Sequence, residues 1–137
     1  MNCGTILFDS KFQFPDGTTD YKLIIIVCDY GTNYLVLQTT RQPDGKNNVA
    51  GCQLNDKPLN YYIPERTLWF EDNTWILLDE IFEYNSDEFF YKEADGIVFH
   101  KSVLSNNFMK QLIECALKSR DIDGFDKEYI QRAYDNL

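Results

Sequence analysis

The feature that most constrains the fold is an unbroken apolar run, Leu23–Cys28, in the first quarter of the chain. Most of its residues are β-branched, and the lack of polar alternation predicts a strand that is covered on both faces. A turn containing Gly31 follows, and Tyr34–Arg41 returns as a second strand. We therefore expect a central β-hairpin whose second strand ends in hydroxyl and guanidinium groups.

The other segments predict short strands first and helices last. A serine at position 105 suits a helix N-cap, and the apolar residues after it recur at helical spacing up to about Ser119. We expect short strands at Thr5–Phe8, Tyr61–Ile63, Leu68–Phe70, Trp75–Leu78 and Ile97–Phe99, a helical turn at Glu88–Ala94, and a second C-terminal helix at Asp126–Asn136.

This order of elements predicts a small α+β domain. We expect a bent antiparallel sheet or an SH3-like barrel with one or two C-terminal helices. Residues 1–137 form one domain in this interpretation, with the β part in residues 1–100 and the helices in residues 101–137. The connection Gln42–Asn60 is long and lacks a clear period, and such loops are either functional or mobile.

The net charge of -9 is concentrated in the middle of the chain. Residues 61–100 contain two Lys/Arg against ten Asp/Glu. The sequence shows no basic patch of the kind that nucleic-acid-binding proteins usually carry. The acidic segment is either a solvated face or a docking surface for a basic partner.

The N-terminus, the apolar runs and the cysteines indicate the cellular compartment. The N-terminus lacks a secretory signal pattern, and the longest apolar run is too short to span a bilayer, so we expect a cytoplasmic protein without a membrane partner. Cys3, Cys28, Cys52 and Cys115 lack CxxC spacing and are expected to be free thiols in a reducing cytosol. A zinc site that uses these cysteines, with or without His100, is an alternative.

Three segments together resemble the PemK/MazF-like toxins, a family of plasmid-maintenance proteins and cell-growth inhibitors. These segments are Gly4–Phe8, Tyr21–Val27 and Val36–Thr40. The resemblance covers residues 4–40, and the remainder of the chain matches only the general plan of an SH3-like barrel with a C-terminal helix. It implies metal-independent cleavage of single-stranded RNA, in which a ribose 2′-hydroxyl attacks the neighbouring phosphate. It implies no cofactor, and it implies a cognate antitoxin and a homodimer.

The resemblance also suggests which residues act. Lys22 falls near the family's arginine, although Tyr21-Lys22 replaces its Arg-Pro pair, and the threonines fall near its hydroxyl residue. We take Lys22, Thr39, Thr40 and Arg41 as candidate catalytic residues, and Lys11, Asp16 and Lys46 as candidate substrate-binding residues. The ordinary alternative is a lysine at a strand edge beside β-favouring threonines.

His100 is the single histidine, which excludes a mechanism that uses two histidines. A general base would have to be a carboxylate, such as Asp16 or Asp20, or a perturbed lysine. Two other functions remain open. One is a non-catalytic binding module with the toxin fold, which would use an acidic, aromatic-rich surface to hold a protein. The other is an unrelated barrel that binds a small molecule.

Overall fold

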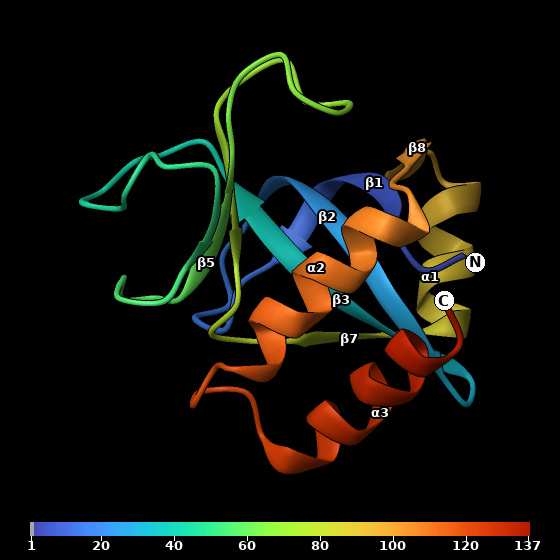
Figure 1. The fold of residues 1–137 in the computed structure, drawn as a ribbon. Helices are drawn as coiled ribbons and strands as arrows, with labels where there is room; N and C mark the ends of the chain where they lie inside the picture. The colour runs from blue at the N-terminus through green and yellow to red at the C-terminus, as the bar shows by residue number, and fades with distance from the viewer. Residues whose placement is uncertain (1) are drawn as a thin grey trace.

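The computed structural model describes residues 2–137, with the side chain of Tyr30 left out, and shows an α+β fold built on eight antiparallel strands (Figure 1). The strand order is β4-β5-β6-β3-β2-β1-β8, and β7 also pairs with β3. The elements are β1 (Thr5–Gln13), β2 (Thr19–Tyr30), β3 (Asn33–Thr40), β4 (Gly51–Gln53), β5 (Asn60–Ile63), β6 (Thr74–Leu77), β7 (Phe82–Asn85), α1 (Ser86–Ala94), β8 (Val98–Val103), α2 (Asn106–Leu117) and α3 (Gly124–Asp135).

The predicted central hairpin is confirmed as β2 and β3. Residues 24–27 are almost completely buried, as expected for an apolar run with protein on both faces. The register pairs Ile24 with Gln38 and Ile25 with Leu37. This register brings the start of β2 and the end of β3 to the same end of the sheet.

The sheet bends at β3, which changes partners along its length. Its first half, Asn33–Val36, pairs with β7, whereas Thr39 and Thr40 pair with β6. Within the described residues the edge strands β4 and β8 do not pair with each other, so the sheet is open. The predicted α+β class with a bent antiparallel sheet is confirmed, and the sheet is not closed into a barrel.

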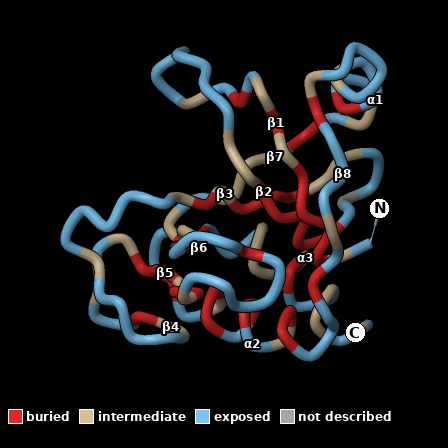
Figure 2. The backbone as a smooth tube through the Cα atoms, turned by 90° about the horizontal axis from the view of Figure 1, so that it is seen from above, coloured by how far each residue is buried: buried red, intermediate tan, exposed pale blue. Residues whose placement is uncertain are grey.

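Each face of the sheet has its own apolar core. Helices α2 and α3 lie together across one face (Figure 1), where Ile6, Ile25 and Leu37 are buried against them. The smaller core lies on the opposite face, where Phe89 of α1 packs with Phe12 and Tyr84. Figure 2 shows the buried residues following the strands and the inner sides of the helices, while the connecting loops are exposed.

The two predicted C-terminal helices are present. The Ser105 Oγ accepts a hydrogen bond from the backbone N–H of Phe108, which caps the start of α2 as predicted. Asp123 caps α3 in the same way. The predicted helical turn at Glu88–Ala94 is part of the longer helix α1. None of the helices in the described residues is long and apolar enough to cross a membrane.

The prediction of four free thiols is wrong for two of them. Cys52 and Cys115 form a disulfide with their Cα atoms 5.7 Å apart. The bond is possible because Gly51–Gln53 pairs with β5, which lies next to α2. The two cysteines are 63 residues apart, so no local pattern indicates the pairing.

Cys3 and Cys28 remain as thiols. Burial raises the pKa of Cys3 to about 11 and that of Cys28 to about 12, so both stay protonated near neutral pH.

Two predictions of local structure were also wrong. Leu68–Phe70 is not a strand; it belongs to a tight loop in which Arg66 and Leu68 have φ values of 56° and 54°. The connection Gln42–Asn60 is not wholly irregular, because it contains β4. In both cases the presence or absence of a partner strand, and not the local pattern, determines whether the short segment becomes a strand.

Candidate functional site

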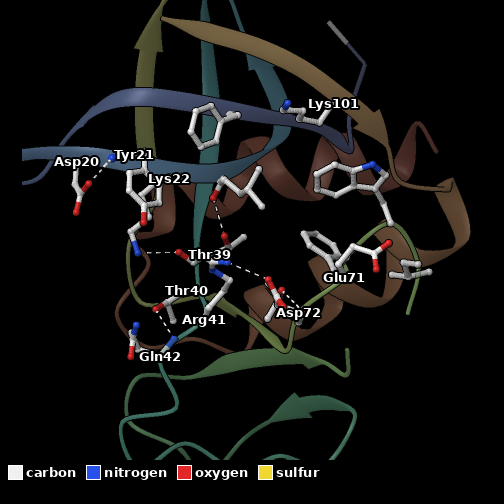
Figure 3. A pocket seen from close by; sticks show the side chains of 16 residues that line it. Asp20, Tyr21, Lys22, Thr39, Thr40, Arg41, Gln42, Glu71, Asp72 and Lys101 are labelled. Carbon is white, nitrogen blue, oxygen red and sulfur yellow. Dashed lines mark hydrogen bonds and ion pairs between the residues drawn. The ribbon is translucent and has the colours of Figure 1, made fainter. Parts of the chain in front are cut away.

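A cavity of about 740 Å³ lies where β2 begins and β3 ends. The loop between β5 and β6 forms one side, and residues from β1 and β8 also contribute (Figure 3). The side chains around it combine cations, hydroxyls, carboxylates and aromatic rings. The lining residues are Phe8, Asp20, Tyr21, Lys22, Leu23, Thr39, Thr40, Arg41, Gln42, Leu68, Trp69, Phe70, Glu71, Asp72, Thr74 and Lys101.

Lys22 is a partly buried cation without an acidic partner. Its Nζ donates a hydrogen bond to the Thr39 carbonyl at 3.1 Å and lies 5.8 Å from the centre of the Phe14 ring. In the described part of the chain no carboxylate lies within ion-pair distance of this nitrogen. The ammonium therefore retains an unneutralised charge and two further donor positions.

The surroundings of Lys22 disfavour its charged form. Burial lowers the pKa of the ammonium below its usual value. The nearby charge of Asp20 raises this pKa, while the charges of Arg41 and Lys46 lower it further. A bound anion would offset both the burial and the repulsion between the cations.

The two threonines have different environments. The Thr39 Oγ1 donates to the Leu23 carbonyl at 2.8 Å, and the residue is buried. The Thr40 Oγ1 accepts a hydrogen bond from the Gln42 N–H at 3.1 Å and is only partly buried. Because Thr40 acts there as an acceptor, its own proton remains available to a ligand. Thr39 holds β3 to β2, and Thr40 is the candidate for ligand contact.

Arg41 lies beside Thr40 and forms an exposed ion pair. Its Nη1 is 3.0 Å from the Asp72 Oδ2, and both side chains are more than half exposed. Exposed pairs of this kind are worth only about 0–1 kcal/mol. An incoming anion can therefore replace Asp72 at the guanidinium. Figure 3 shows Lys22, Thr40 and Arg41 along one wall of the cavity.

The structure thus brings together Lys22, Thr39, Thr40 and Arg41, which are the four candidate catalytic residues. The candidate substrate-binding residues Lys11, Asp16 and Lys46 do not line the cavity.

Asp16 accepts hydrogen bonds from the backbone and the hydroxyl of Thr18 in the turn before β2. These bonds lower the pKa of its carboxyl, which makes it a poor proton acceptor. Lys46 donates to the carbonyls of Gln42 and Pro43 in its own loop. Lys11 is exposed on β1.

The sequence interpretation missed most of the lining residues as site residues, and four of these carry aromatic or cationic groups that can contact a ligand. Tyr21 and Trp69 are aromatic side chains that are 56% and 38% exposed. Trp69 directly follows Leu68, whose φ is 54°, and lies in a loop where the sequence interpretation expected the strand Leu68–Phe70. Lys101 and Phe8 come from β8 and β1, and no local signal links them to Lys22.

The candidate zinc site has no counterpart in the structure. Cys52 and Cys115 are joined to each other, and His100 lies on the surface with its Nε2 2.8 Å from the Glu93 Oε2. Residues 2–137 contain no cluster of three or more His, Cys, Asp or Glu side chains arranged to hold a metal ion.

The chain matches no protein-family model, and a search of curated proteins finds no similar sequence. The proposal of a function therefore depends on the chemistry of the cavity.

Proposed function

We propose that this protein is a PemK/MazF-like endoribonuclease toxin that cleaves single-stranded RNA in this cavity without a metal ion. One observation carries the proposal: Lys22, Thr40 and Arg41 line one cavity together with exposed aromatic rings. This combination suits a phosphodiester flanked by unpaired bases.

The phosphate would bind between the two cations. The guanidinium of Arg41 can form two parallel hydrogen bonds with phosphate oxygens once Asp72 is displaced. Lys22 supplies a second positive charge, and Thr40 can donate a hydroxyl hydrogen bond. These donors are suited to the charge that develops on the phosphate oxygens in the transition state.

Single strands fit this cavity better than duplexes. Tyr21 and Trp69 are exposed rings, and stacking on such rings requires bases that are not already paired and stacked. The overall charge of -9 opposes non-specific binding of a phosphate backbone. Recognition would therefore depend on the local cations and on stacking.

The proposed reaction is an internal transesterification. The 2′-oxygen forms a bond to the adjacent phosphorus while the bond from phosphorus to the 5′-oxygen breaks. The 2′-hydroxyl loses its proton to a carboxylate, for which Asp20 at the cavity wall is the candidate, and the 5′-oxygen gains one from the Lys22 ammonium or water. The products are a 2′,3′-cyclic phosphate and a free 5′-hydroxyl.

Partners follow from this proposal. An antitoxin would inhibit the protein by covering the cavity, and RNA as substrate implies action in the cytoplasm. A homodimer, as the family resemblance implies, is a further proposal.

The decisive experiment is an RNA cleavage assay in EDTA with the purified chain. We expect wild-type protein to cut a labelled single-stranded RNA, leaving cyclic phosphate ends, and to leave the same RNA intact in a duplex. Lys22→Ala and Thr40→Val should each lower the rate at least tenfold, as typical for loss of a charge-stabilising donor. Lys118→Ala is the matched control, because this exposed lysine lies outside the cavity.

The proposal is wrong if wild-type protein does not cut RNA, or if Lys22→Ala cuts as fast as Lys118→Ala. A parallel test in bacteria uses induced expression, where growth arrest by wild-type protein should be relieved by Lys22→Ala. Normal growth with intact bulk RNA would contradict a toxin.

A second candidate function is supported by helix α1. Phe90 and Tyr91 are 65% and 67% exposed on this helix, and acidic residues surround them in the sequence. Exposed aromatic rings in an acidic setting suit a basic protein partner. In this alternative a lysine-rich peptide should bind to the chain, and a Phe90→Ala, Tyr91→Ala double variant should weaken binding while Lys22→Ala leaves it unchanged.

A further inference from the structure

Aromatic side chains form a row across three neighbouring strands beside the cavity. Phe8 of β1 lies directly opposite Phe99 of β8, and cross-strand partners project from the same face of a sheet. On the other side, the Phe8 ring lies 6.0 Å from the ring of Tyr21 on β2, with only 31° between their planes. Tyr21, Phe8 and Phe99 thus form a continuous surface, which we call the aromatic row.

A lysine lies over this row. The Nζ of Lys101 is 5.8 Å from the centre of the Phe8 ring and 5.9 Å from that of Phe99. Lys101 is exposed, and no ion pair occupies it within the described residues. The aromatic row therefore carries a positive charge that is free to meet an anion.

The aromatic row is open to solvent and continuous with the cavity. Tyr21 and Phe99, on the strands that flank β1, are 56% and 47% exposed, and a contiguous exposed apolar patch of this kind marks an interaction site. Phe8, Tyr21 and Lys101 also line the cavity, whereas Phe99 lies beyond it. Figure 3 shows Tyr21 beside Asp20 and Lys22, and Lys101 farther along the cavity.

Alternating rings and cations suit a single-stranded nucleic acid. Bases stack on exposed aromatic faces without regard to their identity, and ammonium groups bind the phosphates between them. A peptide partner would gain the same apolar contact, but it would leave Lys101 and the cations of the cavity without anions. Charge complementarity therefore favours a polyanion with flat apolar groups.

We propose that the aromatic row is a second subsite, which binds the nucleotides next to the scissile phosphate by stacking and by pairing Lys101 with a backbone phosphate. This inference depends on the proposed function, because it takes the ligand of the cavity to be RNA. Strands lie about 4.8 Å apart, so three neighbouring strands span roughly 10 Å. The aromatic row therefore extends beyond the space that a single phosphate group occupies.

The test uses non-cleavable 2′-O-methyl oligonucleotides of two and six nucleotides and measures affinity by fluorescence anisotropy. We expect Phe99→Ala to weaken binding of the hexamer at least fivefold and to leave the dinucleotide unchanged, since Phe99 lies outside the cavity. Phe99→Tyr should restore most of the affinity. Phe125→Ala is the matched control, because Phe125 is an exposed phenylalanine on α3 that does not line the cavity. Lys101→Gln should lower the slope of the logarithm of affinity against the logarithm of salt concentration by about one.

The outcomes separate the two proposals. If Phe99→Ala binds the hexamer as wild-type protein does while Lys22→Ala loses it, the second subsite is wrong and the cavity stands. If wild-type protein binds neither oligonucleotide, both proposals fail. If Phe99→Ala converts a dimer into a monomer without changing oligonucleotide affinity, the row is an interface between copies of the chain and the subsite is again wrong.

Discussion

Two lysines near Asp9, Lys92 on α1 and Lys22 on β2, show how a buried charge with an acidic partner differs from one without. Lys92 Nζ lies 2.8 Å from the Asp9 Oδ2, and Asp9 is completely buried. The hydroxyl of Tyr84 and the backbone N–H of Lys11 also donate to this carboxylate. Each charge in this cluster is thus neutralised and hydrogen-bonded, as buried ions require.

Lys22 has the opposite arrangement. Asp9 is its cross-strand neighbour in the register of β1 and β2, yet the carboxylate of Asp9 binds Lys92 instead. Lys22 retains one backbone acceptor, the Thr39 carbonyl. The comparison indicates that the Asp9 cluster stabilises the fold, whereas Lys22 carries a charge that is available to a ligand.

The largest expected effect is on stability, at Asp9. Asp9→Ala leaves the Lys92 ammonium without a counter-ion and removes the acceptor of Tyr84. We expect the free energy of unfolding to fall by about 3–5 kcal/mol, as for other broken buried pairs. Urea unfolding followed by circular dichroism measures this change. Asp16→Ala is the control and should cost much less stability than Asp9→Ala, because Asp16 is exposed and has no ion-pair partner among the described residues. Equal losses in the two variants would contradict the comparison.

The second prediction concerns binding, at Lys22. Lys22→Ala should lower the affinity for a single-stranded oligonucleotide by about tenfold or more, since hydrogen bonds to charged groups contribute about 1.5–3 kcal/mol. Its stability should change by about 1 kcal/mol or less, because only one hydrogen bond is lost. Anisotropy and urea unfolding together separate the two effects. A variant that unfolds as readily as Asp9→Ala would show that Lys22 is structural.

The third prediction concerns the ion pair that an anion must displace. Asp72→Asn releases Arg41 from its carboxylate partner, so affinity for the same oligonucleotide should rise. The pair is exposed and worth about 0–1 kcal/mol, which limits the gain to about fivefold. The gain should shrink at high salt, because salt screens exposed charges. A loss of affinity would indicate that Asp72 contacts the ligand directly.

The smallest expected effect is a pH dependence. Burial lowers the pKa of Lys22 below the ordinary lysine value of 10.5, so its charge is lost at a lower pH than that of a lysine side chain in water. Binding should weaken as pH rises through this lowered pKa. Lys22→Arg should move the decline to higher pH, since arginine stays charged. An identical pH profile for both proteins would contradict this assignment.

The lowered pKa of Lys22 also makes stability depend on pH, and this contribution rises with pH where binding weakens. Between the lowered pKa and 10.5, the unfolded chain binds more protons at Lys22 than the folded chain does. The contribution of Lys22 to the free energy of unfolding therefore rises with pH across this window.

The amino-acid sequence alone determined the central hairpin, the helix that begins after Ser105, and the meeting of Lys22 with Thr39, Thr40 and Arg41. Each of these depends on local patterns: an apolar run, an N-cap with helical spacing, and a tight turn that aligns the ends of two strands. Such signals act over one or two elements, so they can be detected without knowledge of the rest of the chain.

Only the tertiary structure decided the contacts between elements that are far apart in the chain. The disulfide joins Cys52 to Cys115, the cluster of Asp9 joins β1 to α1, and the cavity gains Trp69 and Lys101 from distant loops and strands. The long-range pairing of β1 with β8 brings Phe99 beside Phe8. These contacts depend on which strands become neighbours in the sheet. That choice is made by the burial of whole faces, which no short stretch of sequence records.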